Sequence, residues 1–491
     1  MLTDLSFLNI GQRWPPADEE DRLDLYDTNK RLFEGDHADV YEESFKRIER
    51  IIGNFNQVIS YPVIINYQKK ISLKVADLLF GEPPRINAGD EESAEQKTID
   101  TIKENADLIN TAYECSIDIS RYGDGILNVY KDGNKGLIDV TPPSIWFPVV
   151  DMNNLKKIQF HVLAWEYKIE SADKTEKRLK VQIHNKGFYD ESEYRLAYDA
   201  NKNVSNTVIQ TLQSGPVRVK TGLDDFALIP IPNIITSDRV TGLDDYSEVD
   251  SIISELLVRV GQISRVLDKH ASPSVTGPST ALEKDPVTGE WKLKMGNYFP
   301  RNDKDDPIVG YITWDGQLEA SFKHIENLIN MLYTISEMGS AIFGDVSQKS
   351  GQIPSGSALR RLMISPLAKV NRVRMRFDPA LKKAIKLCSQ LGGEGITDLS
   401  NVPISITWQD GLPGDPKEEA DIMKIRTADK ATMSQKRALM QFDGMANKEA
   451  EEELELIKED EASSNPFTLT PFTGEPMEKG DISTDNKEPK E

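Results

Sequence analysis

Cysteine is scarce in this chain, which has only Cys115 and Cys388 among its 491 residues. A secreted chain of this length usually carries several disulfides, so the scarcity favours a reducing compartment. Long apolar runs are scarce too: the longest, residues 226–235, contains two prolines and is too short to span a bilayer. Residues 1–12 have neither the basic nor the apolar region of a signal peptide. We therefore expect a soluble protein, intracellular at synthesis and without membrane contact.

Basic residues fall short of acidic ones, with 59 Lys and Arg against 80 Asp and Glu and a formal net charge of −21. Tight, sequence-independent binding of nucleic acid needs many Lys and Arg side chains to neutralise phosphates. The net charge excludes a protein whose main function is tight binding of nucleic acid. It does not exclude a protein that acts on DNA without binding it tightly. The chain is roughly three times the size of a common domain, which indicates two to four folded units.

The common signatures of catalysis are missing as well. The five histidines lie far apart, and none has a cysteine or an acid at metal-ligand spacing. Neither a GxxxxGK[ST] phosphate-binding loop nor a GxSxG nucleophile elbow occurs. With 80 acids, paired carboxylates arise by chance and indicate nothing. We predict no enzyme activity, no cofactor and no metal site, and a soluble hydrolase remains the weaker alternative.

The first 245 residues combine helical and strand patterns. Apolar residues recur at helical spacing between Pro62, a favoured first position, and Gly81, a favoured stop. A second helix is predicted over about 100–122. From Gly125 the apolar period changes to two, which predicts antiparallel strands at 125–130, 137–140, 158–165 and 179–184. This order, without βαβ units, favours one α+β domain.

Two long helices of matched length come next, at 246–270 and 318–343, and would be ~37 and ~39 Å long. They enclose residues 271–317, which are rich in Gly, Pro, Lys and Asp and contain short strand-like pieces. The arrangement predicts an antiparallel two-helix stalk with a small β module at its tip. Periodicity alone is equally consistent with an ordinary helical hairpin inside one domain.

A loop of small polar residues, 345–354, leads into a long helical stretch over 355–392. Pro366 and Pro379 predict kinks in it. The stretch holds nine Lys and Arg against one Asp, so its net charge is +8. Such a face is by default solvated or ion-paired rather than a surface for DNA.

The C-terminal part is acidic and helical, with 20 acids and 11 bases from residue 414 onward. Helices are predicted near 415–428, 434–442 and 447–460, after a strand at 402–408. Beyond Ser463 the chain has almost no aliphatic residues, so we expect a disordered tail.

Four stretches together resemble the portal proteins of tailed bacteriophages, specifically the family of long-tailed phages of Gram-positive hosts. In chain order they are Asn66–Lys70 with Ala76–Pro84, Tyr122–Gly125 with Pro143–Val149, the helix–insert–helix block ending in Ser355–Arg360, and Trp408–Pro413 with Asp415. Their order and spacing cover about residues 20–460.

The resemblance implies a multi-domain α+β portal fold, assembled as a ring of normally twelve identical subunits at one capsid vertex. The implied parts are an N-terminal arm (1–24), a wing (25–245 and 355–412), stem helices (246–270 and 318–343), a clip (271–317), a tunnel loop (344–354), a helical crown (413–462) and the tail (463–491).

The resemblance also suggests which residues serve the ring. A channel for sliding DNA should bind phosphate weakly, and the tunnel loop would contribute Asp345, Ser347, Gln348, Lys349, Ser350 and Gln352. We expect clip contacts with partners from Lys284, Lys292 and Lys294. We expect contacts between subunits from Arg360, Arg361, Arg372, Arg374 and Arg376.

The implied function is a head-to-tail connector, through which double-stranded DNA enters during packaging and leaves during ejection. Expected partners are further copies of the chain (twelve, or thirteen when expressed alone), double-stranded DNA, the terminase large subunit, major capsid and scaffolding proteins, and head-completion or adaptor proteins. The expected location is the virion, with assembly in the host cytoplasm. Another scaffold or adaptor ring protein of the virion is the main alternative.

Overall fold

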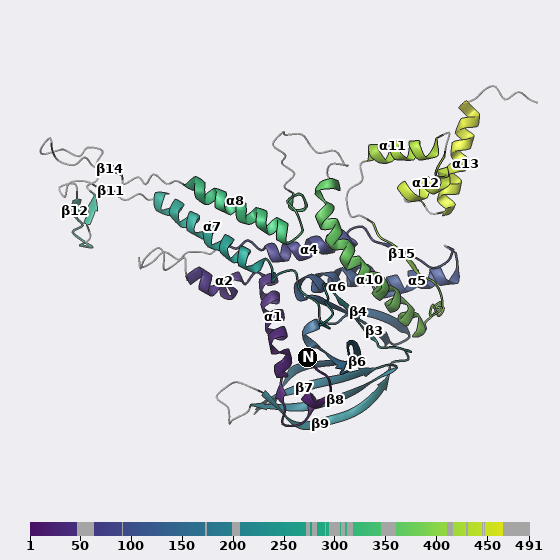
Figure 1. Ribbon diagram of the computed structural model, residues 1–491, viewed down its shortest axis with the longest axis horizontal. Helices are drawn as coiled ribbons and strands as arrows, with labels where there is room; N and C mark the ends of the chain where they lie inside the picture. The colour runs from purple at the N-terminus through teal and green to yellow at the C-terminus, as the bar shows by residue number, and fades with distance from the viewer. Residues whose placement is uncertain are drawn as a thin grey trace, which may run out of the picture. The chain divides into compact units, whose positions relative to one another are not determined.

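The computed structural model (Figure 1) describes residues 1–46, 63–90, 92–171, 174–198, 207–271, 275–276, 282–289, 291–293, 305, 310–311, 318–344, 360–409, 416–428, 431–443, 445 and 447–464. The chain forms two compact units, residues 1–413 and 414–491. Helices and sheets are mixed in the first unit, which confirms the expected α+β class. Among the helices described, none is both long and apolar enough to cross a membrane.

The first unit contains most of the regular structure. Among the described residues, its main helices are α1 (Ala17–Glu34), α2 (His37–Val40), α4 (Tyr67–Phe80), α5 (Ala94–Asn105), α6 (Leu108–Tyr122), α7 (Asp250–Ala271), α8 (Leu318–Ile335) and α10 (Ile364–Gln390). Its larger strands are β3 (Asp124–Asp132), β4 (Lys135–Val140), β5 (Trp146–Asp151), β6 (Asn154–Ser171), β7 (Lys174–Asn185), β8 (Phe188–Tyr198), β9 (Thr207–Lys220) and β10 (Leu228–Pro232).

Short strands complete this unit: β1 (Arg13–Trp14), β2 (Arg85–Asn87), β11 (Val275–Thr276), β12 (Leu282–Lys284), β13 (Trp291–Leu293), β14 (Gly310–Tyr311) and β15 (Ser405–Thr407). The second unit contains α11 (Pro416–Thr427), α12 (Gln435–Phe442) and α13 (Asn447–Ser464). These three helices begin within one residue of the predicted positions. The start of α12 is capped by Ser434, whose hydroxyl oxygen accepts a hydrogen bond from the Arg437 backbone amide.

The largest sheet is antiparallel, with the strand order β1-β9-β8-β7-β6-β5. Alternate residues of β5 to β9 face a core that the N-terminal segment covers with Phe7 and Trp14. The Trp14 ring lies 5.1 Å from the Phe147 ring, centroid to centroid. The opposite sheet face of β7 and β8 carries ion pairs, such as Arg178–Glu193. The predicted antiparallel pairing is correct for β3 with β4 and for β6 with β7. The single meander is wrong, because these two hairpins belong to different sheets, and β5, β8 and β9 lay outside the predicted strands.

A second core joins helices to the three-stranded sheet β10-β3-β4. Here α10 packs against α4, and Phe377 is fully buried beside Phe80, with ring centroids 5.2 Å apart. Phe80 in turn lies 5.6 Å from the Trp408 ring. These contacts bring residues from three distant parts of the sequence into one aromatic cluster.

Several predicted helices differ from the structure. α4 begins at Tyr67 instead of near Pro62, and α7 begins at Asp250 instead of near residue 246. The helix expected over 318–343 ends at Ile335, because Glu337 and Gly339 adopt positive φ angles of 59° and 65°. The helix expected over 100–122 is two helices, broken at Asp107 with φ 43°. Pro366 lies in the first turn of α10, where it removes no helical hydrogen bond, and only Pro379 lies in the interior.

The aromatic cluster predicts the effect of a truncation. Phe377→Ala should lower the unfolding free energy by about 3–5 kcal/mol, since it leaves a cavity in a filled core. Met152→Ala, at an exposed hairpin tip, should change it by less than about 0.5 kcal/mol. Chemical denaturation of both variants checks this, and equal midpoints would contradict the packing.

Candidate functional site

The helices α7 and α8 meet the rest of the first unit at one place. The chain enters α7 through a turn in which the Asp244 carboxylate accepts hydrogen bonds from the backbone amides of Tyr246 and Ser247, each 2.7 Å long. The chain leaves α8 at Ile335, two residues before Glu337, which has a positive φ angle. The two helices run side by side (Figure 1), so a two-helix stalk is present.

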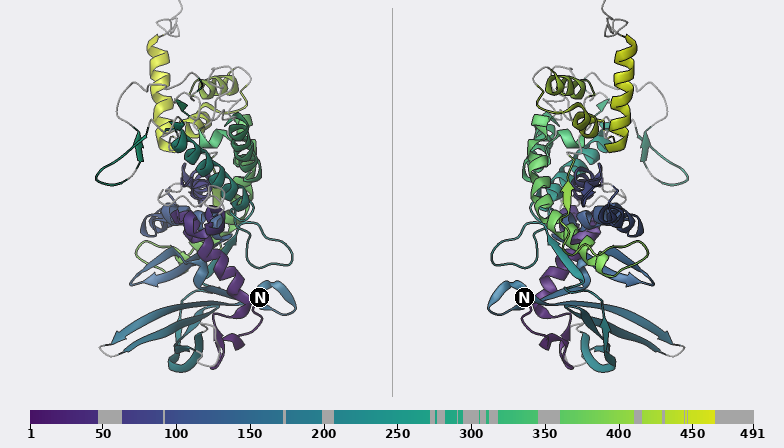
Figure 2. Two further views of the ribbon diagram at one scale, coloured as in Figure 1. Left: turned by 90° about the vertical axis from the view of Figure 1, so that its left-hand side faces the viewer. Right: turned by 90° about the vertical axis from the view of Figure 1, so that its right-hand side faces the viewer.

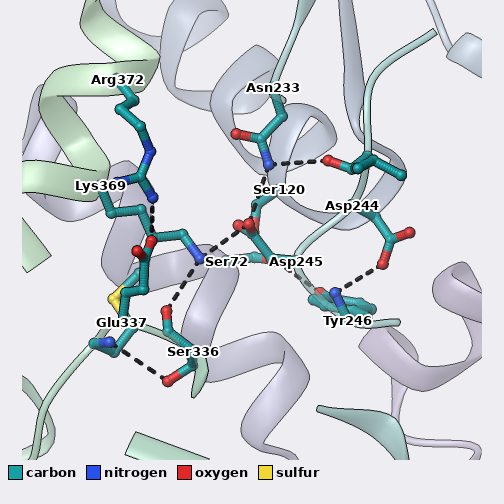
Figure 3. A network of polar contacts seen from close by, with 12 residues as sticks. Ser72, Ser120, Asn233, Asp244, Asp245, Tyr246, Ser336, Glu337, Lys369 and Arg372 are labelled. Carbon is teal, nitrogen blue, oxygen red and sulfur yellow. Dashed lines mark hydrogen bonds and ion pairs between the residues drawn. The ribbon is translucent and has the colours of Figure 1, made fainter. Parts of the chain in front are cut away.

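A buried ion pair connects both helix ends to α10 (Figure 3). The Lys369 ammonium lies 2.9 Å from a carboxylate oxygen of Asp245, and both side chains are at least nine-tenths buried. The same ammonium donates a 3.2 Å hydrogen bond to the carbonyl oxygen of Ser336. One side chain therefore links the turn before α7, the end of α8 and the first half of α10.

Further polar side chains extend this contact into the core. Asp245 accepts hydrogen bonds from the Ser120 hydroxyl at 2.7 Å and from the Asn233 amide at 3.0 Å. Ser72 donates to Ser120 at 2.9 Å and lies 2.7 Å from the Tyr246 hydroxyl. We call Ser72, Ser120, Asn233, Asp245, Tyr246, Ser336 and Lys369 the polar joint.

A second network holds the first turn of α7. The Gln68 amide donates to the Tyr41 hydroxyl at 2.8 Å and to the Asp250 carboxylate at 3.0 Å, and Tyr41 donates to Asp250 at 3.0 Å. A ring nitrogen of His37 lies 3.0 Å from the Gln68 oxygen. Burial raises the pKa of Asp250, the first residue of α7. The helix is thus attached through two polar networks.

A third buried carboxylate ties α1 to the segment before α7. Asp124 accepts hydrogen bonds from the Tyr26 hydroxyl and from the Gly242 amide, both 2.8 Å long. Burial raises the pKa of Asp124 from 3.8 to about 6, although these donors and Arg22 favour the charged form. The close approach at Gly242 also excludes a side chain there, since a Cβ would lie 2.0 Å from the Gly123 carbonyl oxygen.

A groove of about 700 Å³ runs over the polar joint. Four large apolar side chains on its walls are solvent-exposed: Ile234 by 41%, Leu243 by 36%, Ile335 by 41% and Met375 by 69%. Arg372 and Arg376 of α10 also line it, and Arg372 forms an ion pair with Glu337. The geometry suits binding of a protein surface. Within the described part of the chain, no group of His, Cys, Asp and Glu side chains could hold a metal ion.

The basic residues expected to contact other subunits divide into two groups. Arg360, Arg361, Arg372 and Arg376 are exposed. Arg374 is buried, and its guanidinium donates to the carbonyl oxygens of Leu78, at 3.0 Å, and Gln409. The expectation for Arg374 is therefore wrong, because this side chain stabilises its own subunit from the inward face of α10.

The remaining predicted site residues lie mostly outside the described residues. This holds for Asp345, Ser347, Gln348, Lys349, Ser350 and Gln352 of the predicted tunnel loop, for Lys294, and for nearly all of the predicted tail. Lys284 is exposed at the end of β12, which pairs with β13, and Lys292 occupies a position in β13. Their role as partner contacts stays a prediction.

The sequence interpretation missed the polar joint, although two signals were present. Asp244 and Asp245 directly precede the apolar run of α7, where acids cap helices. Lys369 lies between Pro366 and Val373 on the apolar side of α10, an unusual position for a lysine without a buried partner. Neither signal identifies the partner, since the joint combines residues up to 297 positions apart along the chain, from Ser72 to Lys369.

Comparison with known proteins gives the family. Residues 14–466 match the model described as phage portal protein, SPP1 Gp6-like. The chain belongs to this family. Portal proteins of this family are structural, which confirms the expectation that the chain is not an enzyme.

Solved structures similar to this portal protein come from gene transfer agent (GTA) particles. A chain from the neck of the empty GTA particle is 11% identical, with a TM-score of 0.46, and the match covers 77% of this chain and 90% of that one. A chain from the virion of the native GTA particle is also 11% identical, with a TM-score of 0.43 and coverages of 89% and 96%. No curated protein matches this chain. The family match alone carries the assignment.

The polar joint predicts a large effect of removing its cation. Lys369→Met should lower the unfolding free energy by about 3–5 kcal/mol, because it leaves the Asp245 carboxylate buried without a counter-charge. Lys369→Met/Asp245→Asn should regain part of that loss. The control Lys382→Met removes the more exposed pair with Asp378 and should cost at most about 1 kcal/mol. Equal losses for both single lysine variants in denaturant titrations would contradict the assignment.

The raised pKa of Asp124 predicts a pH-dependent stability difference. Because the folded pKa of about 6 exceeds the ordinary 3.8, the contribution of Asp124 is fully present below pH 3.8 and is lost as the pH rises through about 6. The stability of Asp124→Asn relative to the natural chain should therefore rise by about 2–3 kcal/mol between about pH 4 and pH 7. Denaturant midpoints across this range measure the difference, and a constant difference would refute the prediction.

Proposed function

We propose that this portal protein forms a ring of normally twelve subunits at one capsid vertex, through which double-stranded DNA passes during packaging and ejection. The observation that carries the proposal is the family match over residues 14–466. ATP hydrolysis would belong to the terminase, in keeping with the missing phosphate-binding loop.

The two-helix stalk supports this assignment. In our proposal α7 and α8 are the stem and residues 271–317 are the clip. The other sheets with α1, α2, α4 to α6 and α10 are the wing, and α11 to α13 are the crown. The polar joint would then attach the stem to the wing. Through Lys369 it would hold the start of α7 and the end of α8, which are the two stem ends next to the wing. A stem that lines a channel needs such an attachment, because load on the channel wall must pass to the rest of the subunit.

Charge supports a channel that does not hold DNA. The net charge of −21 per subunit would repel a polyanion when many copies surround it. Several bases of α10 are engaged within the subunit: Lys369 and Arg374 are buried, and Arg372, Lys382 and Lys383 form ion pairs. The small, polar segment 345–354 would contact DNA weakly, with Lys349 as its only base.

The proposed partners follow from the same role. The terminase large subunit and later the head-completion or adaptor proteins would bind the clip, for which Lys284, Lys292 and Lys294 are candidates. Major capsid and scaffolding proteins would contact the outside of the ring. The proposed location is the virion, after assembly in the host cytoplasm.

The mass of the assembled protein tests the proposal. Native mass spectrometry should show a species of twelve or thirteen times the subunit mass of 55.2 kDa. Negative-stain images of the same fraction should show rings with a central hole. A monomer at all salt, protein and divalent-ion concentrations would contradict the proposal. Closed particles without a channel would instead favour a scaffold protein.

A further inference from the structure

The outward face of α10 is an exposed stripe of bases and apolar residues. Its members repeat at helical spacing and are all solvent-exposed: Ile364, Ala368, Arg372, Met375 and Arg376. Residues 360–376 contain six bases and no acid. Two of these bases, Lys369 and Arg374, are buried, and the other four are exposed. We call this surface, with Arg360 and Arg361, the basic stripe.

The groove over the polar joint borders the basic stripe. Arg372, Met375 and Arg376 belong to both surfaces, and Ile234, Leu243 and Ile335 add exposed apolar area. Contiguous exposed apolar side chains with a polar rim mark a surface that binds another protein. Arg376 and Arg361 have no ion pair among the residues that the structure describes, so both charges are available to a partner.

A second exposed surface of the same unit, on α5, is acidic. Residues 92–107, which include α5, contain five acids and two bases. Asp100 and Glu104 lie one helical turn apart on the exposed side of α5. The inward side of α5, with Ile99 and Ile102, packs into the same core that α10 covers. α5 contacts α10, and Figure 2 shows α10, in green, and dark blue helices extending to different sides of the unit.

We propose that the basic stripe and its groove bind the acidic α5 edge of a second copy of this chain. The inference rests on the proposed ring, because a closed ring requires two different surfaces that fit one another on opposite sides of each subunit. Opposite charges on these surfaces fix which side meets which. The apolar groove supplies the buried area, and Arg361 and Arg376 face Asp100 and Glu104 of the second copy.

Charge reversal on each edge tests the pairing. Arg361→Glu/Arg376→Glu and Asp100→Lys/Glu104→Lys should each lower the ring fraction at fixed protein concentration by about tenfold or more. A chain that carries all four substitutions should recover rings to within about threefold of the natural chain, since its reversed edges are again complementary. Native mass spectrometry measures the fractions, and melting curves of each variant verify folding.

A matched control separates this pairing from a general effect of charge. Asp21→Lys/Asp24→Lys changes two exposed acids of α1 by the same total charge and should leave the ring fraction unchanged. Rings that persist in both single-edge variants, or that fail to return in the combined variant, would overturn the proposed pairing and leave the ring itself standing. A natural chain that never forms rings would instead refute the proposed function. If a single-edge variant fails to fold, Arg361→Gln/Arg376→Gln or Asp100→Asn/Glu104→Gln replaces it, with a smaller, salt-dependent loss of rings expected.

Discussion

The structure of the first unit depends on one buried contact between charges. Lys369 neutralises Asp245 and binds the Ser336 carbonyl, so one ammonium group fixes the start of α7, the end of α8 and the course of α10. Burial of two ions is costly unless every remaining donor and acceptor is satisfied. Ser120 and Asn233 supply those partners to Asp245. The start of α7 and the end of α8 are thus held at one ammonium group by directional contacts.

The pattern of local residues predicted much of this fold. The capped helix α12 and the hairpins β3–β4 and β6–β7 follow from period and turn chemistry alone. The end of α8 did not, because Glu337 is a non-glycine residue with positive φ, held there by its surroundings. Asp107 breaks α5 from α6 in the same way. Backbone conformations that are imposed by tertiary contacts cannot be recognised from the neighbouring residues in the sequence.

The candidate site was less accessible to sequence reasoning than the fold. Counting charge located a basic helix, but could not separate Arg374, which stabilises the subunit interior, from Arg372 and Arg376, which face outward. That distinction depends on the orientation of α10 over α4 and β10, and therefore on long-range packing. The family resemblance identified the portal role from motifs spread over most of the chain, and the match over residues 14–466 confirms it.

The central claim is that Lys369 couples the α7–α8 stalk to the rest of the unit. Hydrogen–deuterium exchange of Lys369→Met against the natural chain tests it most directly, because exchange reports local opening segment by segment. We predict faster exchange at residues 332–338 and 244–249, with the β6–β8 strands unchanged. Unchanged exchange at both helix ends, or an equal increase throughout the first unit, would contradict the claim.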